Sequence, residues 1–175
     1  MKLGKDFFSR DAEVVARDLL GKILSRKQGK KILKARVVET EAYFDEKDPA
    51  SRACKNGNLR ETMKMQGGTI LVYGVHNNWL INFVTGEKGK AEAVLIRALE
   101  PLNFNARASG PGLLCKALGI DKNFHGKSIL NNKELWIEYN KEKFNIVERK
   151  RIGIKKDLSK ELRFYIDKNK FISKK

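Results

Sequence analysis

The chain has 175 residues, enough for one domain with a substantial core, and its 37 lysines and arginines outnumber its 21 aspartates and glutamates by a net charge of +16. This balance favours a polyanionic partner such as nucleic acid. There is no signal peptide, no apolar run near the ~20 residues of a transmembrane helix, no P-loop or GxSxG motif and no metal-ligand spacing of Cys or His. We therefore expect an intracellular protein without metal or cofactor, with residues 1–175 forming a single domain.

The first part of the chain predicts a helix followed by a hairpin. Apolar residues at helical spacing indicate a helix over 11–20, which Gly21 ends. Residues 23–26 and 32–41 then read as two strands, joined by a polar turn that contains Gly29.

The second strand of this hairpin ends in two carboxylates. Because strand side chains alternate, Glu39 and Glu41 share a face with the apolar residues before them, and Tyr43 joins this face if the strand continues. Close like charges and partial desolvation raise the pKa of one member and prepare it as a general base. The alternative is a strand end that enters solvent, with both acids paired to surface lysines.

The middle of the chain predicts a long loop and a second hairpin. Residues 45–58 are polar, and a short helical turn over 60–65 follows them. Strands at 69–73 and 79–85 flank a turn that carries His76 at an exposed tip.

An arginine interrupts the next apolar strand. Residues 92–99 alternate cleanly and place Arg97 in a buried-strand pattern. A buried arginine needs an anionic partner, for which Glu39 and Glu41 are the obvious candidates. A purely structural salt bridge explains the same pattern.

The last third predicts one helix and several short strands. Gly110-Pro111-Gly112 suits the start of a helix over 113–118. Strand-like runs at 135–139, 144–147, 151–154 and 163–166 alternate with lysine-rich turns. The predicted fold is α+β: a single compact domain with a mostly antiparallel curved sheet and a few short helices.

Several blocks of the sequence occur together in one known family. They are residues 7–10, 15–22, 38–43 (Val-Glu-Thr-Glu-Ala-Tyr), 48–51, 94–101 (Val-Leu-Ile-Arg-Ala-Leu-Glu-Pro), 110–120, 151–154 and 163–165, with Ser173. In this collinear order the chain resembles the alkyladenine (3-methyladenine) DNA glycosylases of base-excision repair. The resemblance implies a monofunctional enzyme that binds damaged double-stranded DNA through the minor groove, and a monomer is the default expectation. It flips an alkylated purine or hypoxanthine into a pocket and hydrolyses the N-glycosidic bond, leaving an abasic site, without metal or cofactor.

The same resemblance assigns roles to individual residues. Glu41 is the expected general base that activates water, and Arg97 helps to hold that water. Tyr43 and Tyr73 sandwich the flipped base, and Asn82 lies near its exocyclic edge.

The resemblance also assigns a residue that inserts into the DNA, and the sequence differs from the family pattern at three positions. The resemblance places His76 as the aromatic wedge that fills the gap in the DNA, although Tyr73 is the other candidate. Arg52 stands where the family has histidine, Leu113 where it has a basic residue, and Glu61 where it has asparagine. If Arg52 lines the base pocket, its fixed charge disfavours cationic alkylpurines and favours neutral lesions such as hypoxanthine.

The charge distribution keeps two other functions open. Residues 1–36 carry a net charge of +7 and residues 141–175 one of +8, so the centre is nearly neutral. These basic ends fit either a rim that grips phosphates or a lysine-rich soluble surface. The alternatives to the enzyme are a non-catalytic domain that senses damage or binds RNA, and a hydrolase of free modified nucleosides, which does not explain the charge.

Overall fold

The computed structural model describes residues 1–174. Within this range the chain forms α1 (Lys5–Phe8), α2 (Ala12–Leu19), β1 (Ile23–Gln28), β2 (Lys31–Tyr43), α3 (Asn58–Met63), β3 (Ile70–Val75), β4 (Asn78–Val84), β5 (Ala93–Pro101), α4 (Pro111–Leu118), β6 (Leu135–Glu138), β7 (Ile146–Arg149) and β8 (Arg163–Ile166). Two short 3-10 helices, Arg52–Cys54 and Lys122–Phe124, lie in the connections. None of the helices in this range is long and apolar enough to cross a membrane.

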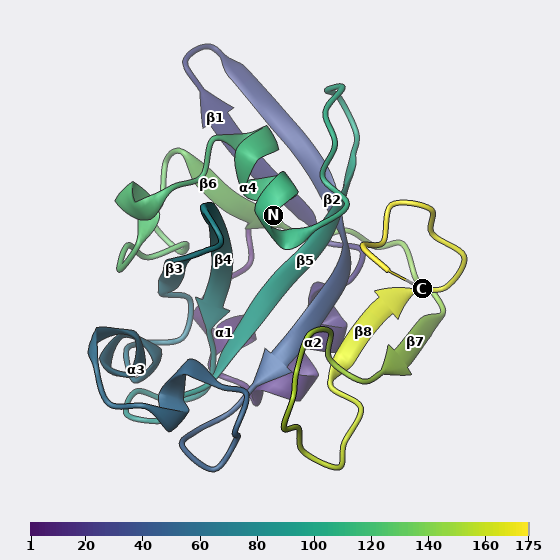
Figure 1. Cartoon of the computed structure of the whole chain (residues 1–175). Coiled ribbons are helices and arrows are strands. Elements are labelled where there is room, and N and C mark those ends of the chain that lie inside the picture. The colour runs from purple at the N-terminus through teal and green to yellow at the C-terminus, as the bar shows by residue number, and fades with distance from the viewer. Residues whose placement is uncertain (175) are drawn as a thin grey trace.

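Strand β2 organises a curled antiparallel sheet (Figure 1). The first half of β2 pairs with β1 and its second half pairs with β8, while β5 runs along its other edge. The main order is β3-β4-β5-β2-β1-β6, and β7 joins through β8. The 13 residues of β2 therefore touch three neighbouring strands, and any side chain near its end is surrounded by protein.

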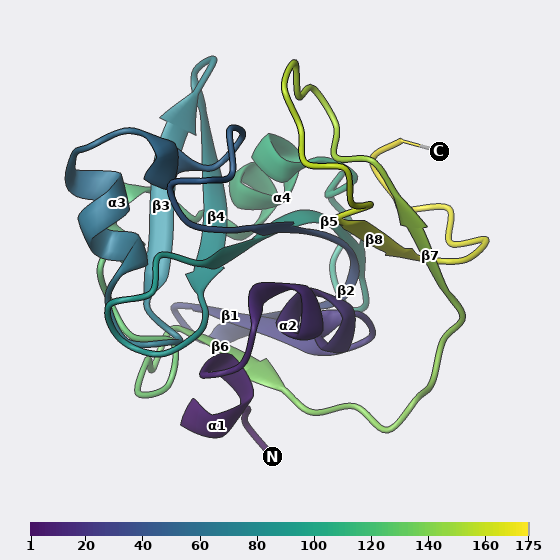
Figure 2. The ribbon, with the colours of Figure 1, turned by 90° about the horizontal axis from the view of Figure 1, so that it is seen from below.

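Helices α2 and α4 lie on opposite sides of this sheet (Figure 2). Asp11 caps α2 by accepting a hydrogen bond from the N–H of Glu13, and the apolar side of the helix packs against β2 and β5. The Thr40 hydroxyl of β2 donates to the carbonyl oxygen of Ala16 at 2.8 Å. Residues 37–42 of β2 are all buried, so the polar ones need partners inside the protein.

The predicted α+β class is confirmed, and the two hairpins and the strand with Arg97 lie within a few residues of their predicted positions. The strand predicted at 151–154 is wrong, since these residues form turns. There the Arg151 side chain is buried among carboxylates and the N–H of Ile152 donates to Glu41, so neither joins a strand ladder. Helix α1 was not predicted, and a 3-10 helix lies within the loop predicted at 45–58.

Candidate active site

Two register shifts bring charged residues of β2 and β5 together. The pairs around the shifts are Val37–Leu99, Glu39–Ala98 and Thr40–Ile96. Val38 on β2 and Arg97 on β5 therefore have no partner residue in the ladder, and each forms a β-bulge. Bulges of this kind redirect side chains next to functional sites. The Arg97 guanidinium lies 3.5 Å from Glu39 and 3.4 Å from Glu41. The predicted pairing of this arginine with both acids is present.

Glu41 is a fully buried carboxylate with three donors. The Tyr43 hydroxyl donates to it at 2.7 Å, the N–H of Ile152 at 2.8 Å and the Arg97 guanidinium at 3.4 Å. Burial raises the pKa of Glu41 above its ordinary value, although the charge of Arg97 and the two shorter hydrogen bonds act in the opposite direction. A carboxylate of this kind can accept a proton closer to neutral pH than an exposed glutamate can.

Tyr43 connects this carboxylate to an aromatic pocket. Burial and the neighbouring negative charge of Glu41 hold the pKa of Tyr43 well above its ordinary value, so the hydroxyl keeps its proton and remains a donor. The Arg151 guanidinium lies over the Tyr43 ring, 4.6 Å from its centroid. The same side chain therefore fixes the base candidate and forms a wall beside it.

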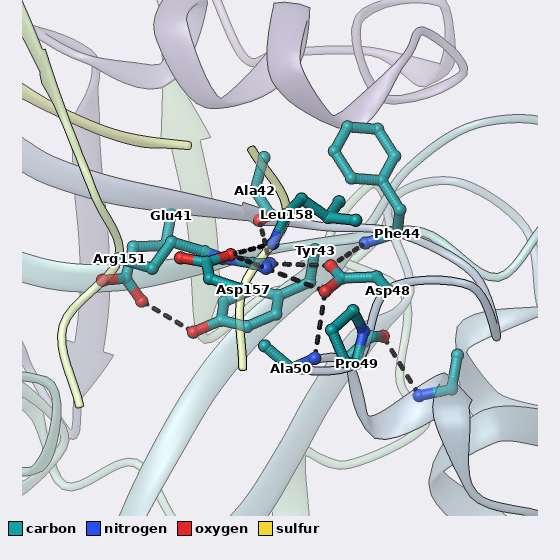
Figure 3. A network of polar contacts seen from close by, with 12 residues as sticks. Glu41, Ala42, Tyr43, Phe44, Asp48, Pro49, Ala50, Arg151, Asp157 and Leu158 are labelled. Carbon is teal, nitrogen blue, oxygen red and sulfur yellow. Dashed lines mark hydrogen bonds and ion pairs between the residues drawn. The ribbon is translucent and has the colours of Figure 1, made fainter. Parts of the chain in front are cut away.

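Arg151 belongs to a tight ionic network, which Figure 3 shows. It binds the two carboxylate oxygens of Asp48 at 2.7 and 2.8 Å, contacts Asp157 at 2.5 and 3.1 Å and donates to the carbonyl oxygen of Ala42 at 3.0 Å. Burial acts to raise the pKa of Asp48, but hydrogen bonds from Arg151 and from main-chain N–H groups outweigh it and bring the pKa below its ordinary value. This network joins the loop after β2 to the segment before β8, and its arginine packs against the face of the Tyr43 ring.

The predicted base-pocket residues lie around one narrow cavity, whose free volume is only about 10 Å³. Its lining consists of Tyr43, Ala50, Arg52, Met63, Leu71, Tyr73, Asn82 and Ala93. Exposed Arg52 places its guanidinium 4.7 Å from the centroid of the Tyr73 ring, which is a cation–π contact. The Asn82 side chain is nearly fully buried and donates to the carbonyl oxygen of Leu71 at 3.3 Å. The structure thus brings Tyr43, Tyr73, Asn82 and Arg52 together.

Comparison with known proteins identifies the family of this site. The family model of methylpurine-DNA glycosylase matches residues 6–170, which include all the residues just described. The chain belongs to the methylpurine-DNA glycosylase family. The resemblance inferred from the sequence is thereby confirmed.

Individual relatives cover nearly the whole chain. A protein of Clostridium perfringens (strain SM101 / Type A) is 41% identical over 207 residues, covering 100% of both chains. One from Aeropyrum pernix is 41% identical over 98% of this chain and 93% of its own, and one from Borrelia garinii subsp. bavariensis is 41% identical over 97% and 98%. Each is provisionally named a 3-methyladenine DNA glycosylase.

In this family member, His76 lies at the exposed tip of the β3–β4 hairpin. His76 and Asn77 have φ angles of +46° and +61°, which are the left-handed conformations of a tight two-residue hairpin turn. Helix α4 packs against the hairpin next to this turn. A Cβ atom on Gly112 would lie 2.7 Å from the Asn78 side chain. Glycine therefore lets the first turn of α4 approach the hairpin. Tyr73, the alternative wedge, lines the cavity and is half-buried.

The other two departures from the family pattern lie outside the cavity lining. Glu61 is an exposed residue of α3 and forms an ion pair with Lys64 at 3.1 Å. Leu113 lies half-buried in the first turn of α4. Of the three departures, Arg52 alone contributes to the lining of the cavity.

Sequence reasoning missed several residues that build this family site. Asp48, Arg151, Arg163 and Ser173 lie in blocks that carry the family resemblance, but the sequence assigns none of them a role. Arg163 donates to Glu39 at 3.0 Å, and the N–H of Ser173 donates to the other oxygen of the same carboxylate. A signal existed for Glu39, because a second buried acid needs a partner, but nothing in the sequence distinguishes Arg163 from the many basic residues around it.

The carboxylates of Glu39 and Glu41 accept hydrogen bonds from arginines, from main-chain N–H groups and from the Tyr43 hydroxyl. Within residues 1–174, no group of three or more His, Cys, Asp or Glu side chains is arranged to hold a metal ion. The two free cysteines lie apart, Cys54 exposed and Cys115 buried. The chemistry that this arrangement itself supports is proton transfer at Glu41.

Proposed function

We propose that this protein is a monofunctional DNA glycosylase that removes an alkylated purine or hypoxanthine from double-stranded DNA and leaves an abasic site. The observation that carries the proposal is Glu41, a buried carboxylate with a raised pKa that faces Arg97 beside an aromatic pocket. A carboxylate in this position can activate water, and tyrosines can stack on any purine. The family and the names of the relatives support the same reaction.

In the proposed step, the oxygen of a water molecule forms a bond to C1′ of the deoxyribose while the bond between C1′ and the base nitrogen breaks. The electron pair of the breaking bond goes to the departing base, and Glu41 accepts the proton that the water loses. Arg97 holds the water through Nη1, because the contact of Nη1 with Glu41 is long, at 3.4 Å, and leaves this group able to donate to a water molecule. A cationic alkylpurine departs as a neutral base, whereas hypoxanthine takes a proton from solvent.

The target base must leave the duplex to meet Glu41, because the carboxylate is buried. In our proposal, Tyr43 and Tyr73 flank the flipped base and Asn82 reads its exocyclic edge. His76 enters from the minor groove and fills the gap, as inserted side chains of minor-groove proteins do. The tip of the β3–β4 hairpin and the connection between β7 and β8 reach the same side of the molecule, away from α1 (Figure 2). This is the side on which we place DNA, bound by a monomer.

Arg52 is the proposed determinant of lesion choice. Its guanidinium lies over Tyr73 at the cavity, and a fixed positive charge there opposes a cationic base and tolerates a neutral one. We therefore propose that neutral lesions such as hypoxanthine are preferred to cationic alkylpurines.

The decisive experiment compares base release by the unmodified protein and by Glu41→Gln under single-turnover conditions. Duplexes carry one hypoxanthine or one alkylated purine. We expect release by the unmodified protein and a loss of about 10²- to 10⁴-fold in the variant, with duplex affinity retained. Glu87→Gln, at an exposed glutamate, is the matched control. Equal rates for the unmodified protein and Glu41→Gln, or no release of either base, would refute the proposal.

Lesion choice is tested by exchanging Arg52 for the family's histidine. Arg52→His is expected to raise the rate for the cationic alkylpurine relative to hypoxanthine, because the fixed charge beside Tyr73 is removed. Lys55→His removes a positive charge from the same loop at a residue that does not line the cavity, and it should leave the ratio unchanged. An unaltered ratio in Arg52→His would reject the role of Arg52 and leave the glycosylase proposal intact.

A further inference from the structure

A short segment after β8 reaches the Glu39 and Arg97 pair from a distant part of the chain. The Ser173 hydroxyl oxygen accepts hydrogen bonds from Nε and Nη2 of Arg97, each at 3.4 Å. The main-chain N–H of Ser173 donates to Glu39 at 2.5 Å. One residue therefore contacts both members of the ion pair.

This segment is held in place by several independent contacts. Phe171 and Ile172 pack against the main hydrophobic core. The Asn169 side chain accepts a hydrogen bond from the N–H of Phe171 at 2.8 Å, and Arg163 donates to the carbonyl oxygen of Lys174 at 2.8 Å. Terminal segments are usually poorly ordered unless they are tied down, and residues 171–174 are tied down on both sides of Ser173.

The nitrogen atoms of the Arg97 guanidinium face two different partners. Nε and Nη2 face Ser173, whereas Nη1 faces Glu41 at 3.4 Å. Glu39 lies 3.5 Å from Nε, but it already accepts shorter bonds from Arg163 and from the N–H of Ser173. The serine hydroxyl is thus the neutral acceptor that fixes the direction of the guanidinium without competing with Glu41 for its charge.

We infer that Ser173 is a positioning residue for Arg97, and that residues 171–174 complete the active site. The inference rests on the proposed function, because it gives a catalytic purpose to the orientation of Arg97. Ser173 touches neither water nor DNA in this scheme. It acts by keeping Nη1 of Arg97 directed toward Glu41 and the attacking water.

The experiment compares Ser173→Ala, which removes the hydroxyl, with Ser173→Thr, which keeps it. We expect the single-turnover rate of Ser173→Ala to fall about tenfold, as for loss of a modest hydrogen bond to a charged group, and that of Ser173→Thr to stay near the unmodified rate. Ser9→Ala removes a hydroxyl that donates to a main-chain carbonyl near α1 and serves as the control. Duplex affinity should be unchanged in all three.

Two further measurements separate positioning from a structural role. Arg97 lowers the pKa of Glu41, so a displaced guanidinium should move the inflection of the rate–pH profile of Ser173→Ala to higher pH. In NMR spectra of ¹⁵N-labelled protein, the Nε–H resonance of Arg97 should shift in Ser173→Ala and be retained in Ser173→Thr. An unchanged Arg97 resonance or an unchanged rate in Ser173→Ala would overturn the inference.

The same data distinguish failure of this inference from failure of the proposed function. If the unmodified protein releases neither base, the proposed function fails, and the inference about catalysis is overturned with it. The Arg97 resonance then reports only whether Ser173 holds the guanidinium. If the unmodified protein is active and Ser173→Ala is equally active, the positioning role alone is refuted.

Discussion

Two buried arginine networks share Tyr43 and differ in how closely they hold their partners. Arg151 contacts Asp48 and Asp157 at 2.5 to 3.1 Å, whereas every contact of Arg97 with a side chain is 3.4 to 3.5 Å long. The first network is complete and joins two loops. The second leaves hydrogen-bonding capacity, and catalytic contacts are often long before the substrate arrives. Bond length therefore separates a structural arginine from a catalytic candidate in the same site.

The largest expected effect comes from breaking the tight network. Asp48→Asn leaves the fully buried Arg151 without its bidentate partner, and we expect a loss of about 3 to 5 kcal/mol in the free energy of unfolding, or roughly 10 °C in Tm. Thermal and urea unfolding measure this, with exposed Asp167→Asn as the control. A Tm equal to that of the control would contradict a structural role for this network.

The loose network should show the opposite behaviour. Arg97→Gln is expected to lower the single-turnover rate about 10²-fold, because the water loses its charged donor. Its Tm should fall by less than that of Asp48→Asn, since Glu39 keeps its bonds to Arg163 and to the N–H of Ser173, and Glu41 keeps those from Tyr43 and from the N–H of Ile152. A fall in Tm as large as that of Asp48→Asn would erase the distinction between the networks.

The smallest expected effect is an opposite pH dependence of stability. The pKa of Glu41 is raised in the folded state, so its ionised form lowers stability as the pH rises through that pKa. The pKa of Asp48 is lowered, so its contribution is present at neutral pH and is lost in acid. Glu41→Gln should therefore melt a few degrees above the unmodified protein at neutral pH, with no difference below the ordinary glutamate pKa. A constant difference across the pH range would contradict this.

The sequence predicted the parts of the site that follow strand alternation. An arginine and two acids in apolar strands indicated a buried ion pair, and Arg97 does contact Glu39 and Glu41. Grouping Tyr43, Tyr73, Asn82 and Arg52 required the family resemblance, because these residues come from different elements. Their functional roles remain predictions.

The other parts of the fold and the site depend on tertiary contacts, which the local sequence pattern does not reveal. Residues 151–154 have strand-like alternation, but burial of Arg151 and the bond from Ile152 to Glu41 outweigh that local preference. Ser173 lies among lysines, and its role depends on the path of the chain after β8. A basic-rich segment looks the same in sequence whether one of its arginines is exposed or fully buried.

The two register shifts between β2 and β5 constrain the lengths of both strands. Val38 and Arg97 each add one residue, on opposite strands, and the register before them is restored after them. Deleting Val38 alone would turn Glu41 toward the helix-covered face, because a one-residue slip exchanges the two faces of a strand. Deleting both residues together should restore a continuous register between the two strands, because the pairing on either side of the shifts has the same offset. The approach of Arg97 to Glu39 and Glu41 thus coincides with one extra residue on each of two paired strands.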